Sequence, residues 1–136
     1  MSNARIAVLI VAAGRGTRLG EGVPKQYRPL LGRAVLAHAI EEVRRALPEA
    51  FLTCVIGPED RADYEAALGE AAPDAVAGGA SRQESVFLGL KALTAQSPDI
   101  VLIHDAARPF GIDAVAGRLL KALQGGGFDG AAPGLE

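Results

Sequence analysis

The residues with the clearest chemical potential follow the first apolar run of the chain, Ile6 to Val11. This run is rich in β-branched residues, which is typical of a buried strand. Gly14 and Gly16 come next, and without Cβ atoms they can turn tightly and bring backbone N–H groups close to an anion. Arg18 and Lys25 then add two long cationic side chains to the same loop. The loop therefore predicts a triphosphate site, and the alternative is a strand-to-helix turn with solvated charges.

This glycine loop matches neither of two common phosphate-binding motifs. No Gly-Lys-Ser/Thr follows it, so it is not a P-loop. A third glycine comes only at Gly20, too late for the dinucleotide-binding pattern G-x-G-x-x-G. The signal lies in the combination of strand, glycines and Arg18 with the Pro-Lys-Gln-Tyr sequence at residues 24–27.

Two further polar clusters follow other apolar runs. A second glycine turn, Gly78-Gly79, leads into Ser-Arg-Gln-Glu-Ser at residues 81–85. The third cluster, His-Asp-Ala-Ala-Arg-Pro at residues 104–109, follows another apolar run. Its only carboxylate is Asp105.

Together the clusters predict a site of mixed charge. Its four cations are Arg18, Lys25, Arg82 and Arg108. Asp105 lies among them, and Mg²⁺ usually takes one or two carboxylates plus phosphate oxygens and waters. This mixture suits a nucleoside triphosphate with Mg²⁺. The alternative for Asp105 is an ion pair with Arg108.

Strands and helices must bring these clusters to one edge. The patterns predict strands over residues 5–12, 51–56, 74–77, 100–103 and 128–132. They predict helices over 34–47, 59–68 and 112–123, and one that buries Val86, Leu90 and Leu93. Residues 27–32 are expected to be irregular, because Pro29 opposes a helix. The alternation implies an α/β fold with a mostly parallel sheet and right-handed crossovers, in which ligands bind beyond the carboxyl ends of the strands.

Composition narrows the class of protein. The chain has 136 residues, enough for one domain with a core, and a net charge of −2 that argues against non-specific nucleic-acid binding. No apolar stretch approaches the roughly 18 residues of a membrane span, and no signal peptide precedes the first strand. The single cysteine, Cys54, predicts a buried thiol in a reducing compartment, so a cytoplasmic location is expected.

Three other polar residues are weaker candidates. His104 is expected to be a packed imidazole rather than a catalytic one, because strand alternation turns it away from Asp105. His38 is expected to be structural, since it lies on a core helix. Asp129 is either a second acid near the site or a solvated loop acid.

Four motifs, in the same order and across nearly the whole chain, resemble those of 2-C-methyl-D-erythritol 4-phosphate cytidylyltransferases. They are Ala-Ala-Gly-x-Gly-x-Arg at residues 12–18, Pro-Lys-Gln-Tyr at 24–27, Gly-x-x-Arg-Gln-x-Ser-Val at 79–86 and His-Asp-Ala-Ala-Arg-Pro at 104–109. The resemblance implies a Rossmann-like three-layer sandwich of the nucleotidyltransferase type. It also implies transfer of CMP from CTP to a sugar-alcohol phosphate with release of pyrophosphate, in isoprenoid biosynthesis.

The resemblance also assigns roles to residues of this chain. It implies CTP-binding residues Ala12, Ala13, Gly14, Gly16, Gly79, Arg82 and Ser85, catalytic cations Arg18 and Lys25, an Mg²⁺ ligand Asp105 and an acceptor-binding Arg108. It predicts that residues 1–136 form a single nucleotide-binding domain that stops before the family's dimer arm and acceptor-binding segment. A homodimer is expected for the full-length protein, and fusion to a cyclodiphosphate synthase domain stays open.

Three alternative functions remain at this point. A ribitol 5-phosphate cytidylyltransferase shares much of the pattern and differs in its acceptor. A CTP-binding module without turnover belongs to a different class. A flavodoxin-like binding domain would have no reason to combine Arg18, Lys25 and Arg82.

Overall fold

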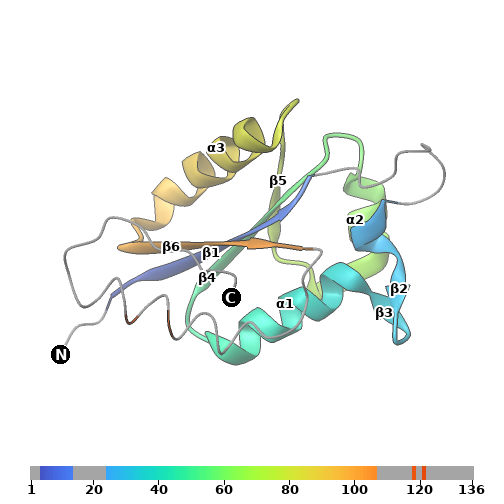
Figure 1. The fold of residues 1–136 in the computed structure, drawn as a ribbon, viewed down its shortest axis with the longest axis horizontal. Coiled ribbons are helices and arrows are strands. Elements are labelled where there is room, and N and C mark those ends of the chain that lie inside the picture. The colour runs from blue at the N-terminus through green and yellow to red at the C-terminus, as the bar shows by residue number, and fades with distance from the viewer. Residues whose placement is uncertain (1–3, 14–23, 107–117, 119–120, 122–136) are drawn as a thin grey trace, which may run out of the picture.

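A parallel four-stranded sheet forms the centre of the computed structural model, which describes residues 4–13 and 24–106 together with Arg118 and Lys121 (Figure 1). Its strands are β1 (Ile6–Ala12), β4 (Phe51–Ile56), β5 (Asp74–Ala77) and β6 (Ile100–Asp105). Their order is β5-β4-β1-β6, and all neighbouring pairs are parallel. The chain moves outward from β1 to β5 and then crosses to β6 on the other side of β1. The topological switch point, where such sheets bind ligands, therefore lies between β1 and β6.

Helices cover both faces of this sheet. Helices α1 (Val35–Ala46) and α2 (Arg61–Leu68) lie on one face and α3 (Arg82–Leu93) on the other, as Figure 1 shows. The predicted three-layer α/β fold is thus confirmed.

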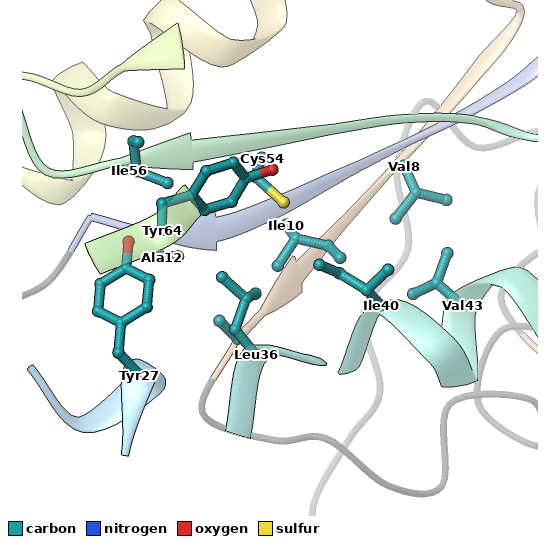
Figure 2. Packing of buried hydrophobic residues seen from close by; sticks show 11 residues of the cluster. Val8, Ile10, Ala12, Tyr27, Leu36, Ile40, Val43, Cys54, Ile56 and Tyr64 are labelled. Carbon is teal, nitrogen blue, oxygen red and sulfur yellow. The ribbon is translucent and has the colours of Figure 1, made fainter. Parts of the chain in front are cut away.

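Alternation along β1 explains the two layers of core. Val8 and Ile10 pack against Leu36, Ile40 and Val43 of α1, all nearly inaccessible to solvent (Figure 2). The residues between them form a second cluster with α3: Ala7, Leu9 and Val11 join Val55 and Leu93, with Val86 and Leu90 packed against them. A strand that is apolar on both faces is expected inside a sheet, and β1 lies between β4 and β6.

The predicted elements agree closely with the observed ones. Strands β4 and β5 have the predicted bounds, β1 begins one residue later than predicted, and α1 is one residue shorter than predicted at each end. Helix α2 begins two residues later than predicted, because Asp60 closes a turn onto Gly57 (N···O 3.0 Å) before it. Strand β6 is two residues longer, so that His104 and Asp105 belong to the strand itself. Arg118 and Lys121 are helical, whereas the rest of the predicted helix 112–123 and the strand 128–132 lie outside the described residues.

The prediction of irregular structure over residues 27–32 is wrong. A 3₁₀ turn η1 (Lys25–Tyr27) is followed by a small antiparallel hairpin, β2 (Pro29–Leu30) and β3 (Arg33–Ala34). Its two loop residues, Leu31 and Gly32, have φ angles of 54° and 85°. Positive φ at both positions is what a tight two-residue hairpin turn requires. A leucine rarely occupies the first of these positions, so the residue types did not indicate a hairpin.

The remaining described elements are short connections, the 3₁₀ turns η2 (Gly69–Ala71) and η3 (Thr94–Gln96). Among the described residues no helix is both long and apolar enough to cross a membrane.

Candidate functional site

A pocket of about 480 Å³ lies at the carboxyl ends of the four parallel strands. Each strand contributes to its wall: Val11 and Ala13 at the end of β1, residues 57–60 after β4, residues 79–82 and Ser85 after β5, and Asp105 at the end of β6. Five of the sequence-predicted site residues therefore share one cavity: Ala13, Gly79, Arg82, Ser85 and Asp105. Such a position at the switch point is where α/β sheets of this kind bind ligands.

The turn between β5 and α3 is held by the side chain of Ser85. The Gly79 amide donates a hydrogen bond to Ser85 Oγ at 3.0 Å, and Ser85 is only 1% exposed. The Gly78 amide donates to the Ile56 carbonyl at 2.6 Å, which ties the turn to the end of β4. A Cβ atom at Gly78 would lie 2.5 Å from Ser85 Oγ, so only glycine lets the backbone come this close. The turn is therefore a fixed wall of the pocket.

A capping arrangement fixes the first turn of α3. Ser81 Oγ accepts a hydrogen bond from the Glu84 amide at 3.1 Å, and Glu84 Oε1 accepts one from the Ala80 amide at 2.7 Å. This closely resembles a capping box, in which side chain and backbone satisfy each other's free groups. It places Arg82, the first residue of the helix, with an exposed side chain at the pocket. The positive end of the α3 dipole and the Arg82 guanidinium both favour an anionic ligand here.

The segment from Gly57 to Asp60 lines the pocket, although it belongs to none of the predicted polar clusters. Asp60 is 4% exposed, whereas Glu59 is exposed. A Cβ at Gly57 would lie 2.4 Å from Asp60 Oδ2, so the carboxylate packs over the glycine backbone. Its position after a buried parallel strand was the available signal, because every other wall of the pocket follows a strand in the same way.

Asp105 reaches the pocket from the far side of β1. It lies beside Val11 in the register, and the next amide, of Ala106, donates to the Val11 carbonyl at 3.0 Å. Its carboxylate is exposed. No cluster of three or more candidate metal ligands occurs among the described residues. A cation held here would therefore take few protein ligands, as Mg²⁺ does when substrate phosphates supply the other oxygens.

Lys25 lies on the 3₁₀ turn η1, and its side chain is exposed. The neighbouring Gln26 turns inward: it is 5% exposed and its Nε2 donates to the Ala12 carbonyl at 2.6 Å. Ala12, predicted to bind CTP, has its side chain in the core cluster, so only its backbone is available to the site. Lys25 is not among the residues that line the pocket.

Of the four predicted cations, the structure describes Arg82 and Lys25. Only Arg82 of these two lines the pocket. Gly14, Gly16, Arg18 and Arg108 lie outside the described residues. The described wall carries three carboxylates, those of Glu59, Asp60 and Asp105. Among the described residues of the wall, carboxylates therefore outnumber cations by three to one.

The other polar candidates among the described residues do not line the pocket. His38 Nε2 hydrogen-bonds to the Leu30 carbonyl and so fixes the hairpin to α1. His104 lies beside Ile10 in the register and faces the α1 side of the sheet, whereas Asp105 faces the α3 side. Cys54 is fully buried, and this burial raises the pKa of its thiol to about 12. These findings agree with the sequence predictions; Asp129 lies outside the described residues.

Comparisons with known proteins place the chain in a family. The model of the family described as "IspD: 2-C-methyl-D-erythritol 4-phosphate cytidylyltransferase" matches residues 6–134. A bifunctional enzyme IspD/IspF from Rhizorhabdus wittichii is 52% identical over 131 residues, which is 96% of this chain and 33% of that protein. A 2-C-methyl-D-erythritol 4-phosphate cytidylyltransferase from Cereibacter sphaeroides is 47% identical over 131 residues, which is 95% of this chain and 57% of that protein.

A solved structure supports the same assignment. The 4-diphosphocytidyl-2C-methyl-D-erythritol synthase from Anaerococcus prevotii superposes with a TM-score of 0.73 at 29% identity, covering 90% of this chain and 52% of that one. The chain spans about a third of the length of the bifunctional relative. The family model, the relatives and the solved structure agree, and the chain belongs to the 2-C-methyl-D-erythritol 4-phosphate cytidylyltransferase family.

Proposed function

We propose that the protein transfers CMP from CTP to 2-C-methyl-D-erythritol 4-phosphate and releases pyrophosphate. The observation that carries this proposal is the pocket itself. The pocket lies at the switch point of the sheet and is lined by both the Gly79–Ser85 turn and Asp105. The chain that forms it belongs to the cytidylyltransferase family. The cytoplasm is the expected location. The bifunctional relatives support a possible fusion to a cyclodiphosphate synthase domain, and a homodimer stays a prediction.

The Gly79–Ser85 turn is the proposed reader of the base. Its backbone is held by Ser85 and Glu84, so its polar groups have fixed positions before a ligand arrives. A base with the wrong donor pattern would leave buried polar groups unpaired, at a cost of about 1–3 kcal/mol each. Cytosine would therefore be selected over uracil and purines by this wall.

The reaction requires the meeting of two anions. An oxygen of the acceptor phosphate forms a bond to the α-phosphorus of CTP, while the bond from that phosphorus to the bridging oxygen breaks and pyrophosphate leaves with the electron pair. The acceptor oxygen is already ionised, so no strong general base is needed. Arg18 and Lys25 are proposed to neutralise the negative charge of the triphosphate and to align it with the acceptor phosphate. Arg108 is proposed to bind the acceptor.

Mg²⁺ is the cation that we propose for Asp105. The donor chemistry fits, because one exposed carboxylate beside an anion-binding helix end leaves the remaining coordination to phosphates and water. When bound, Mg²⁺ would neutralise phosphate charge and help the pyrophosphate to leave. Without a cation, Asp105 would repel the triphosphate.

A binding and turnover experiment tests the proposal. The full-length protein is titrated calorimetrically with CTP, UTP and ATP in the presence of Mg²⁺, and then assayed for pyrophosphate release with each acceptor. We expect selective binding of CTP, and transfer to 2-C-methyl-D-erythritol 4-phosphate rather than to ribitol 5-phosphate. Equal affinity for CTP and ATP would contradict the base-reading turn. Binding of CTP with no release from either acceptor would instead support binding without turnover.

A further inference from the structure

Gln26 connects the turn that carries Lys25 to the end of β1. Its buried Nε2 donates to the carbonyl of Ala12, the last residue of β1, at 2.6 Å. Ala12 and Gln26 are 14 positions apart, and the segment between them contains Gly14, Gly16, Arg18 and Lys25. The hydrogen bond thus connects the two ends of the segment that carries the predicted triphosphate ligands.

Two backbone hydrogen bonds close the turn that carries Gln26. The Tyr27 amide donates to the Pro24 carbonyl at 2.9 Å, and the Arg28 amide donates to the Lys25 carbonyl at 3.1 Å. The Tyr27 side chain is 7% exposed and belongs to the core cluster beneath β1 (Figure 2). Side chains at 25, 26 and 27 therefore take three different directions: Lys25 into solvent, Gln26 onto the end of β1 and Tyr27 into the core.

The choice of an amide at this position has a chemical reason. The end of a strand leaves a carbonyl that no further strand residue can pair with, and a buried acceptor without a donor costs about as much as a lost hydrogen bond. An amide nitrogen supplies the donor without introducing a charge into a buried position. A hydrophobic side chain would fill the space but remove this hydrogen bond to the Ala12 carbonyl.

We infer that Gln26 is a positioning residue for CTP binding and CMP transfer, because it fixes the backbone of Lys25 relative to the end of β1. This inference rests on the proposed function. Gln26 itself does not contact the triphosphate; it acts through Lys25, whose main chain is one peptide unit away. The contribution of Gln26 to CTP affinity therefore depends on the Lys25 amine.

A double-mutant cycle tests this dependence. The variants are Gln26→Met, Lys25→Ala and the double variant, and the measurement is CTP affinity with Mg²⁺ by titration calorimetry. Methionine keeps an unbranched side chain and removes the donor. We expect Gln26→Met to weaken CTP binding about three- to tenfold, as for coupled residues in one network, and to have little further effect once Lys25 is alanine. Equal losses in the parent and Lys25→Ala backgrounds would overturn the inference.

Two controls separate positioning from general destabilisation. Val43→Ala removes core volume from α1, far from the turn, and should lower thermal stability by as much as Gln26→Met without weakening CTP binding. If Val43→Ala weakens binding equally, Gln26 acts only through stability and the inference is wrong. Gln26→Asn keeps the amide but shortens its reach, so it should behave like Gln26→Met; should Gln26→Met fail to fold, Gln26→Asn replaces it in the cycle.

A third measurement does not require CTP. Hydrogen exchange at the amides of Tyr27 and Arg28 should become faster in Gln26→Met, while exchange within α1 stays unchanged. Unchanged exchange at these amides would overturn the inference even if CTP binds. Failure of the parent protein to bind CTP would refute the proposed function, and the exchange result would still decide whether Gln26 holds the turn.

Discussion

Gly89 of α3 lies directly over the side chain of Leu9 in the centre of β1. A Cβ atom at residue 89 would lie 2.5 Å from Leu9 Cδ1 and 3.1 Å from its Cγ. Leu9 is fully buried in the core cluster on the α3 side of the sheet. The close approach of α3 to the sheet therefore depends on this glycine, and α3 in turn presents Arg82 and the Gly79–Ser85 turn to the pocket.

Gly89→Ala should destabilise the fold, although alanine normally favours a helix by about 0.5–1 kcal/mol. Overpacking a full core costs about 1–3 kcal/mol, which outweighs that gain. Urea unfolding measures the difference. Adding Leu9→Val to Gly89→Ala should recover part of the loss, since the two side chains compete for one space. A more stable Gly89→Ala variant would show that α3 can move away from β1 freely.

Lys25→Ala should abolish most CMP transfer and leave stability unchanged. Removing one charge-stabilising group from a reaction site costs about 100-fold or more in rate. The Lys25 side chain is exposed, so its truncation should change the free energy of unfolding by no more than about 0.5 kcal/mol. Lys91→Ala, at an exposed position in the last turn of α3, is the matched control and should alter neither quantity. A large fall in melting temperature for Lys25→Ala would identify Lys25 as a structural residue.

Asp105→Asn should weaken Mg²⁺-dependent CTP binding by at least about tenfold, a loss typical of damaged metal sites. Binding without Mg²⁺ should be unchanged or tighter, because the substitution removes a negative charge that faces the triphosphate. Titrations with and without Mg²⁺ separate these effects. Asp74→Asn is the control, because it removes the same charge at the first residue of β5, at the other end of the strands. It should leave CTP binding unchanged. If the parent protein binds CTP more tightly without Mg²⁺, Asp105 does not hold the metal.

Two buried tyrosines in the same core cluster should respond differently to loss of the hydroxyl. Tyr64 Oη donates to the Pro73 carbonyl at 2.5 Å, so Tyr64→Phe should cost about 0.5–1.5 kcal/mol. Tyr27 Oη is buried and has no hydrogen-bond partner among the described residues. Tyr27→Phe should therefore be neutral or stabilising in the same urea measurement. An equal loss at both positions would show that the Tyr27 hydroxyl is satisfied in solution.

Cys54 should make the fold less stable at alkaline pH. Burial raises the pKa of its thiol from 9.0 to about 12, so between these values the thiol ionises in the unfolded chain and stays neutral in the folded one. The unfolded state is thereby favoured by about 1.4 kcal/mol at pH 10 relative to pH 7. Urea unfolding from pH 7 to pH 10 should show a smaller fall for Cys54→Ala than for the parent. Parallel pH profiles of the two proteins would contradict the shift.

The strands and main helices could be predicted because their signals are local. Apolar runs ended by Gly57-Pro58 and by Gly78-Gly79 defined β4 and β5, and the spacing of apolar residues defined α1. Since the carboxyl ends of parallel strands share one edge, the grouping of Gly79, Arg82, Ser85 and Asp105 also followed from the sequence.

Three features of the structure could not be predicted from the sequence, and two of them depend on contacts between residues that are far apart in the chain. Gln26 binds a backbone carbonyl 14 positions away, and such a contact leaves no periodic pattern. The place of Gly57–Asp60 in the pocket depends on the strand order, which brings the end of β4 next to the end of β1. The Leu31–Gly32 turn adopts positive φ with a residue that rarely does so.

The central place of β1 also sets the order in which the sheet can form. β1 is the first strand among the described residues, yet one of its neighbours, β6, ends at Asp105, and Ile6 pairs with Ile100. The Arg5 amide also donates to Asp99 Oδ2 at 2.8 Å, so the start of β1 is fastened by a contact across 94 positions. Closing so long a segment is slow compared with local pairing. During synthesis, β1, β4 and β5 can pair first, whereas one edge of β1 stays open until β6 has been made. Of the pocket walls that the structure describes, the one that contains Asp105 is thus made last, and a nascent chain can present all of these walls to a nucleotide only after that step.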